Sequence, residues 1–458
     1  MESMKNPLGR EPVKQLLWKF AVPSIIAMMV TSLYNIVDQF FIGHSVGELG
    51  NAATNIVFPL STSSTAIALL FGIGGASAFN LHMGQNKPKE AIHFVGNAAV
   101  MLFGCGTVLM LIAQLFLTPM LRFFSAPDDV LPYAQEYVRV VSLGFPFLIF
   151  SNGGAHLIRA DGSPQYSMLC NLSGALVNTG LDALFVFGFH WGMTGAAWAT
   201  VIGQVLSAML AFRYLCHYRT VKLERAHLRP RKAYIQIITS LGTASFLNQL
   251  AIMVVQIVLN KSLTYYGSLS VYGESTPLAC AGIITKVNMI FFAVIIGLSQ
   301  SIQPISSFNY GAKLYPRVRE AYFLALRYGF VVSLFSFGLF QLIPRQIIGL
   351  FGEGDESYIQ FAVRYFHIYL FFTFLNFIQP ISSTFFTAIG KPKKGTFLSL
   401  TRQTLFLLPL IVLLPLVFGI DGIMYAAPVA DFAAVIVSVM MIRREFRSMK
   451  ALETLPST

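Results

Sequence analysis

Twelve apolar segments, each long enough to cross a lipid bilayer as a helix, follow one another along this chain of 458 residues. A membrane-spanning helix needs about 20 apolar residues. The segments cover about 14–41, 51–79, 90–117, 132–158, 165–189, 193–216, 234–266, 277–308, 318–344, 358–388, 395–419 and 421–442. Only 11% of the residues are charged, against roughly 25% in soluble domains. The sequence therefore predicts an all-α polytopic membrane protein with twelve transmembrane helices.

The second half of the chain repeats motifs of the first half. Ala160-x-Gly162-x-Pro164 returns about 228 residues later as Ala388-x-Gly390-x-Pro392. Further matches join Ala134 and Tyr137 to Ala362 and Tyr365, Ser77-x-Phe79-Asn80 to Ser306-x-Phe308-Asn309, Gly84 to Gly311, and Gly195-x-x-Trp198-Ala199 to Gly422-x-x-Tyr425-Ala426. Six segments per half predict two six-helix lobes related by a pseudo-twofold axis along the membrane normal. We expect an N-lobe at 1–216, a linker at 217–233 and a C-lobe at 234–458.

Basic residues gather at one membrane face. The net charge is +12, and most Lys and Arg residues precede the first segment, follow the last one, or lie in the mid-chain linker and in the short connections assigned to the same side, to which we also assign Arg402. Loops rich in Lys and Arg stay in the cytoplasm, so both termini and the linker are predicted to be cytoplasmic. This distribution indicates charge at a membrane surface and argues against nucleic-acid binding.

The sequence lacks the usual signatures of an energy-coupling or catalytic domain. It contains no GxxxxGK[ST] phosphate-binding loop, so any pumping must draw on an ion gradient or on a partner. The four cysteines stand singly, which predicts neither a disulfide nor a zinc site. No hydrolytic constellation of His, Asp and Ser is evident. We expect a protein that is not an enzyme and that needs no cofactor.

Two acidic residues fall inside predicted membrane segments. Asp38 lies in the first segment and Asp182 in the fifth, and a charge at the centre of a spanning helix costs roughly 2.5–3.5 kcal/mol on insertion scales. Asn178 precedes Asp182 by four residues and so lies on the same helical face. Thr200 in the sixth segment offers a hydroxyl oxygen. Such oxygen atoms in a dry pocket can ligate Na+ or share a proton, so these four residues are predicted to form a cation-coupling site.

A substrate region is predicted beside these acids. Thr31, Tyr34 and Asp38 share one face of the first helix. We expect Thr31, Tyr34, Asn35 and Asn152 to contact the substrate, with aromatic and Met side chains supplying most of the contact area. In the second half the membrane-embedded polar residues are mostly amides with a single base, Lys286, which serves either as a structural counter-charge or in gating.

The pattern Pro23…Tyr34-Asn-x-x-Asp38…Gly43, together with Asn178-x-x-x-Asp182 and Thr200, resembles the multidrug and toxic compound extrusion (MATE) family over about 14–446. The resemblance implies a V-shaped pair of lobes, alternating access, and antiport of lipophilic organic cations against Na+ or H+, with Asp38, Asn178, Asp182 and Thr200 at the family's first-lobe ion site. One branch also carries acidic residues in its seventh and tenth helices. This chain has Asn and Gln there, which favours the other bacterial branches.

The resemblance also implies where the protein works and on what. We expect a multidrug efflux protein of the bacterial cytoplasmic membrane, a monomer in the lipid bilayer, that contributes to antibiotic resistance by exporting small-molecule drugs.

Two other functions remain open at this point. A flippase for a lipid-linked saccharide shares the two-lobe plan, but its central cavity would be strongly cationic, and Lys286 alone is thin support. A membrane-embedded acyl or glycosyl transferase would need clustered His, Asp or Arg residues at one membrane face, which the sequence does not show.

Overall fold

The fold was derived from a computed structural model that describes residues 6–124, 126–273, 275–350 and 356–453. Eleven helices in these ranges are long and apolar enough to cross a membrane, and a twelfth span is formed by a helix pair bent by 40°. All twelve predicted segments coincide with these spans, so the all-α polytopic fold is confirmed. Hydrocarbon offers the backbone no hydrogen-bond partners, and helices satisfy their own.

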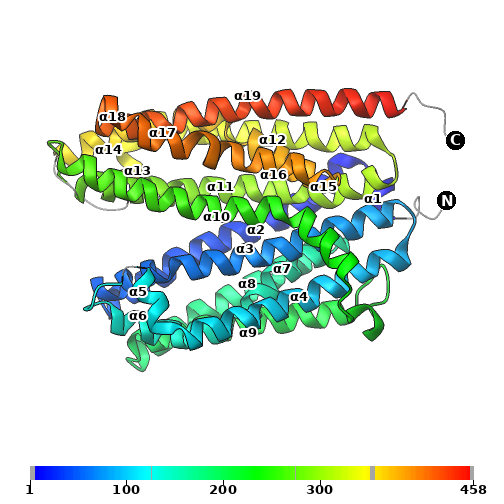
Figure 1. The fold of residues 1–458 in the computed structure, drawn as a ribbon, viewed down its shortest axis with the longest axis horizontal. Coiled ribbons are helices and arrows are strands. Elements are labelled where there is room, and N and C mark those ends of the chain that lie inside the picture. The colour runs from blue at the N-terminus through cyan, green and yellow to red at the C-terminus, as the bar shows by residue number, and fades with distance from the viewer. Residues whose placement is uncertain (1–5, 125, 274, 351–355, 454–458) are drawn as a thin grey trace.

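Two helical bundles make up the molecule (Figure 1). The first half contains α1 (Pro7–Arg10), α2 (Val13–Ser45), α3 (Glu48–Gly84), α4 (Pro88–Leu115), α5 (Leu117–Phe123), α6 (Leu131–Val141), η2 (Ser142–Gly144), α7 (Phe145–Ala160), α8 (Pro164–Asp182), the π-helix η3 (Ala183–Gly188) and α9 (Gly192–Cys216). The linker holds η4 (Arg225–Leu228). The second half contains α10 (Lys232–Ser268), α11 (Ser275–Gly311), α12 (Tyr315–Leu342), α13 (Pro344–Gly349), α14 (Glu356–Tyr369), η5 (Thr373–Leu375), α15 (Ile378–Ala388), α16 (Pro392–Leu400), the π-helix η6 (Thr401–Leu407), α17 (Leu408–Leu413), α18 (Pro415–Phe418) and α19 (Ile420–Glu453).

The repeated Gly-x-Pro motif shapes the same turn in both halves. Gly162 and Gly390 have φ of +81° and +74°, a left-handed conformation that only glycine adopts at little cost. Pro164 and Pro392 then occupy the first turn of α8 and α16, where proline's missing N–H is not needed. The sequence repeat therefore encodes a helix break and restart at equivalent places.

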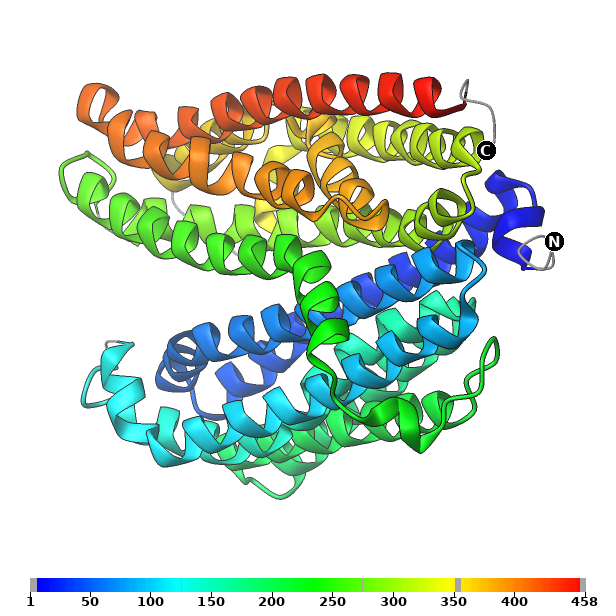
Figure 2. The same ribbon diagram turned by 45° about the vertical axis from the view of Figure 1, so that its right-hand side comes forward.

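The two halves exchange the ends of their leading helices. Leu16 and Phe20 of α2 belong to the apolar core of the second half, whereas Ile238 and Leu241 of α10 belong to an apolar core of the first half. In Figure 2 the leading part of α10 reaches across to the lower bundle before the helix continues along the upper one. The predicted domain limits of 1–216, 217–233 and 234–458 stay a prediction.

Glycines allow the halves to approach closely near the end of the molecule that carries the chain termini (Figure 1). A Cβ atom added to Gly84 would lie 2.1 Å from the carbonyl oxygen of Phe308, and one on Gly311 would lie 2.2 Å from that of Leu81. Gln303 of α11 donates hydrogen bonds to Ser77 Oγ (3.0 Å) and to the Ile73 carbonyl (3.2 Å) of α3. Away from this end the two bundles diverge in both views (Figures 1 and 2).

The linker is fixed to the first half through two polar side chains. Asp161 accepts hydrogen bonds from the backbone N–H groups of Arg219 (2.7 Å) and Thr220 (2.9 Å). Asn97 accepts from the Arg231 N–H (2.7 Å) and donates to the His227 carbonyl (3.3 Å). The mid-chain connection is therefore held against the first bundle along its length.

Two statements about basic residues are wrong. Arg402, assigned above to the cytoplasmic face, lies inside the span Pro392–Phe418 with its side chain only 15% exposed. Lys286 is not the single base within the spans of the second half, because Lys261 lies inside the span Lys232–Ser268. The hydropathy of the sequence did not predict how far inside the membrane spans Arg402 and Lys261 lie.

The contact at Gly84 gives a direct test of lobe packing. Gly84→Val should destabilise this arrangement by about 1–3 kcal/mol, because the added carbons overlap the α11 backbone. The thermal midpoint in detergent, followed by intrinsic fluorescence, should fall. Gly104→Val is the matched control, since nothing lies within 4 Å of a Cβ at Gly104. Equal midpoints for the two variants would contradict the close contact.

Candidate functional site

Helices of the first half bring a polar cluster into the interior of the bundle. Tyr34 and Asp38 come from α2, and Tyr137 comes from α6. Asn178 and Asp182 come from α8, and Thr200 comes from α9. Asn178, Asp182 and Thr200 are buried. The sequence predicted four of these residues as a cation-coupling site and Tyr34 as a substrate contact, and the structure brings all five together.

The two acids are in direct contact. The side-chain carboxyl groups of Asp38 and Asp182 interact with each other at close range. Each also has a buried Oδ1 atom without a hydrogen-bond partner among the described residues. Two adjacent carboxylates repel each other unless a proton or a cation lies between them. The pair is therefore built to take up positive charge.

Asn178 links the acid pair to α9. With its amide nitrogen donating to Asp182 Oδ2 (3.2 Å), its oxygen accepts from the backbone N–H (3.0 Å) and the hydroxyl (3.2 Å) of Thr200. This orientation satisfies both ends of the amide, because nitrogen faces an acceptor and oxygen faces donors. Asn178 thus holds the carboxylate of Asp182 in a fixed position relative to α9.

Tyr137 is a site residue that the sequence analysis did not assign. Its hydroxyl lies close to Thr200, and it interacts electrostatically with Asp38, Asp182 and Tyr34. The repeat already marked Tyr137 through its partner Tyr365, but one tyrosine among 18 gives no functional signal by itself. Its position in the cluster became evident only when α6 was placed beside α9.

Four further predicted residues make no hydrogen bond or ion pair with this cluster among the residues that the structure describes. Thr31 is exposed and donates to the Ala27 carbonyl of its own helix (2.9 Å). Asn35 and Asn152 are partly buried, and Lys286 is exposed on α11. None of these four shows a hydrogen bond or ion pair with the acid pair within the described part of the chain. The substrate assignments and the role of Lys286 stay predictions.

The donor set fits a small hard cation or a proton. Carboxylate, amide and hydroxyl oxygens are the ligands that hard cations prefer. No group of three or more His, Cys, Asp or Glu side chains suited to a metal ion occurs among the described residues. The cluster therefore differs from a transition-metal site, which would use His or Cys.

Two helical bundles built from an internal repeat are an architecture that many membrane transporters share. The profile of the MatE family matches residues 23–184 and 244–413, and the chain belongs to this family. The multidrug export protein MepA of Staphylococcus aureus (strain MRSA252) is 23% identical over 439 residues, covering 94% of each chain. The MepA protein of Staphylococcus haemolyticus is 23% identical over 414 residues, covering 90% of this chain and 89% of that one.

Solved structures agree with this assignment. The MATE multidrug transporter DinF-BH, solved as a ligand complex, is 32% identical, with a TM-score of 0.87 and coverage of 94% of this chain and 95% of that one. An outward-facing MATE transporter of the MOP superfamily has a TM-score of 0.90 at 21% identity, covering 97% and 98%. These relatives are transporters rather than enzymes, and neither alternative function is favoured by them.

Tyr137→Phe tests the added member of the cluster. Loss of the hydroxyl removes one polar contact of the kind worth about 0.5–1.5 kcal/mol, which should weaken binding of a cation in this cluster about threefold to tenfold. Ion-dependent quenching of intrinsic fluorescence in purified protein would measure this. Tyr365→Phe, the repeat counterpart in the second half, should leave affinity unchanged. Unaltered affinity in the Tyr137 variant would place the hydroxyl outside the ion site.

Proposed function

We propose that this protein is a secondary active multidrug exporter that moves lipophilic organic cations out of a bacterial cell in exchange for Na+ or H+. The observation that carries the proposal is the contact between Asp38 and Asp182, two acids with unpartnered oxygen atoms inside a helical bundle of a MatE-family transporter. An exchangeable cation between them would relieve their repulsion. The names of the relatives support drug efflux.

The conformation is consistent with an outward-facing state. The halves meet at Gly84 and Gly311, close to the chain termini and the linker. If this side is cytoplasmic, as the charge distribution predicts, the contacts close the cytoplasmic route and the bundles diverge toward the outside. Alternating access would then require the glycine contacts to open when the coupling ion or the substrate changes.

The coupling role of Asp38 can be tested in proteoliposomes. Asp38→Asn removes one of the two charges, so gradient-driven dye export should fall about tenfold or more, within the usual range of coupling free energies. Sodium and proton gradients are imposed separately to identify the ion. Asp128→Asn, at an exposed loop position, is the control. Export at the normal rate by the Asp38 variant, with either gradient, would remove this site from the mechanism.

The orientation can be tested with a native cysteine. Cys216 is exposed at the end of α9 next to the linker, whereas Cys105, Cys170 and Cys280 are partly or fully buried inside spans. A membrane-impermeant maleimide should therefore label the protein only after cells are permeabilised, and Cys216→Ser should abolish the signal. Labelling of Cys216 in intact cells would reverse the predicted topology.

Competition between substrate and ion follows from their predicted positions. Tyr34, a predicted substrate contact, interacts electrostatically with Asp38 and Asp182, so a bound drug would lie against the ion site. Binding of either ligand should then weaken the other by the same factor. The measurement is the affinity for an ethidium-like dye as Na+ or H+ concentration rises. An affinity that does not fall with either ion would leave only coupling through lobe movement.

A further inference from the structure

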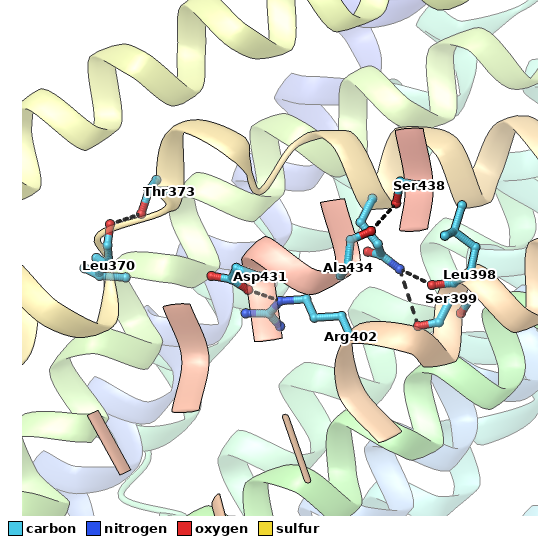
Figure 3. Close-up of polar contacts among 9 residues, drawn as sticks. Leu370, Thr373, Leu398, Ser399, Arg402, Asp431, Ala434 and Ser438 are labelled. Atoms are coloured by element: carbon cyan, nitrogen blue, oxygen red, sulfur yellow. Dashed lines mark hydrogen bonds and ion pairs between the residues drawn. The ribbon is translucent and has the colours of Figure 1, made fainter. Parts of the chain in front are cut away.

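The second half contains a buried ion pair that the proposed mechanism does not use. Arg402 of η6 donates through Nε to Asp431 Oδ1 of α19 at 2.5 Å, and the side chain of Asp431 is 1% exposed. Figure 3 shows the guanidinium and the carboxylate facing each other between the two helices, inside a membrane-spanning bundle. Tyr369 at the end of α14 interacts electrostatically with both charges.

Neighbouring polar side chains do not complete the pair. Thr373 donates to the Leu370 carbonyl (2.7 Å), and Ser438 donates to the Ala434 carbonyl (2.7 Å). Gln379 donates to the Leu398 carbonyl (2.8 Å). These bonds end on backbone oxygens (Figure 3), and Asp431 Oδ2 has no partner among the described residues. Among these side chains of the described residues, the guanidinium of Arg402 is therefore the only positive charge that compensates Asp431.

The repeat relates this pair to the ion site of the first half. Its register aligns Asn178, Asp182 and Thr200 with Phe406, Leu410 and Ala427. The oxygen ligands of the first half are thus replaced by apolar groups at the equivalent places. The extra residue that a π-helix inserts does not change this conclusion, because Leu407 and Ile411, one position further on, are also apolar.

The charges of the second half lie one helical turn from these aligned positions. Arg402 stands four residues before Phe406, and Asp431 stands four residues after Ala427, a displacement of about 5–6 Å along each helix. The same pair of helices in each half therefore holds buried acid, on α8 in the first half and on α19 in the second. Asp38 and Asp182 have no Lys or Arg partner among the observed ion pairs of the described residues, whereas Asp431 has Arg402.

We propose that Arg402 is a tethered cation that permanently occupies the acid of the second half, so that this half binds no exchangeable ion. A guanidinium supplies the positive charge that Na+ or a proton would bring, but it cannot leave. The consequence that coupling is confined to Asp38 and Asp182 rests on the proposed function. The occupation of Asp431 by Arg402 does not depend on it.

The test removes the Arg402 side chain by mutation and supplies free guanidinium ions in solution instead. Arg402→Ala should lower the thermal midpoint by about 5–10 °C, since it leaves a buried acid without compensation. Low millimolar guanidinium, far below denaturing concentrations, should restore part of the loss, and equal concentrations of urea or choline should not. Arg402→Ala/Asp431→Ala should lose the rescue. Arg364→Ala, which breaks the exposed pair with Asp421 (2.7 Å), should show none.

A neutral pair covers the case in which Arg402→Ala does not fold. Arg402→Gln/Asp431→Asn removes both charges together, so this double variant should fold and keep gradient-driven export. Arg402→Gln alone leaves Asp431 without a compensating charge, so it should fail in both respects. The proposal is overturned if guanidinium fails to rescue a folded Arg402→Ala protein, or if the neutral pair is as unstable as Arg402→Gln. Thermal stabilisation of Arg402→Ala by guanidinium is also measured in a variant that carries Asp38→Asn. This stabilisation should persist whether or not Asp38 couples transport, so the proposal for Arg402 and the proposal for Asp38 can fail independently.

Discussion

A charge buried inside one of the helical bundles is costly unless it is compensated locally, because the hydrocarbon around the bundle offers neither water nor counter-ions. The buried charges of the described residues show three arrangements. Asp38 and Asp182 face each other with unpartnered oxygens, and Asp431 faces the guanidinium of Arg402. Arg159, buried near the end of α7, has no carboxylate partner among the observed ion pairs of the described residues and donates to Ser167 (3.0 Å) while contacting His156 (2.9 Å). Only the first arrangement brings two acids together without a fixed cation.

Small residues connect this electrostatic arrangement to movement. Gly84 and Gly311 are related by the repeat, and each lies against the backbone of the opposite half. Where two helix backbones touch directly, no side chain lies between them that could change conformation and adjust the spacing. The contact is therefore either formed or lost. Such a contact favours discrete conformations over gradual ones. The exchange of helix ends, with Phe20 in one core and Ile238 in the other, ties the two bundles together on the same side.

The sequence predicted the fold and most members of the polar cluster around Asp182 because both depend on strong local signals. Apolar length defines the spans, and an acid such as Asp38 inside one stands out. Asn178 could be added because helical periodicity puts it beside Asp182. Tyr137 could not, since its role depends on how α6 packs against α9. The depth of Arg402 was misjudged for a similar reason: the sequence does not show that a basic residue within a span has a buried acidic partner until that partner, Asp431 on another helix, is located.

The duplication explains why the two halves share a fold, but their buried charges explain why they need not share a function. Gene duplication preserves the turn at Gly162 and Gly390 because backbone geometry requires it. It does not require Asn178, whose counterpart is Phe406, since an apolar residue is readily accommodated in a bundle interior. Asp431 has no acidic counterpart in the first half, because the repeat aligns it with Gln204. On the view proposed above, the second half therefore combines two differences from the first: the oxygen ligands are replaced by apolar residues, and the buried acid has a permanent partner in Arg402.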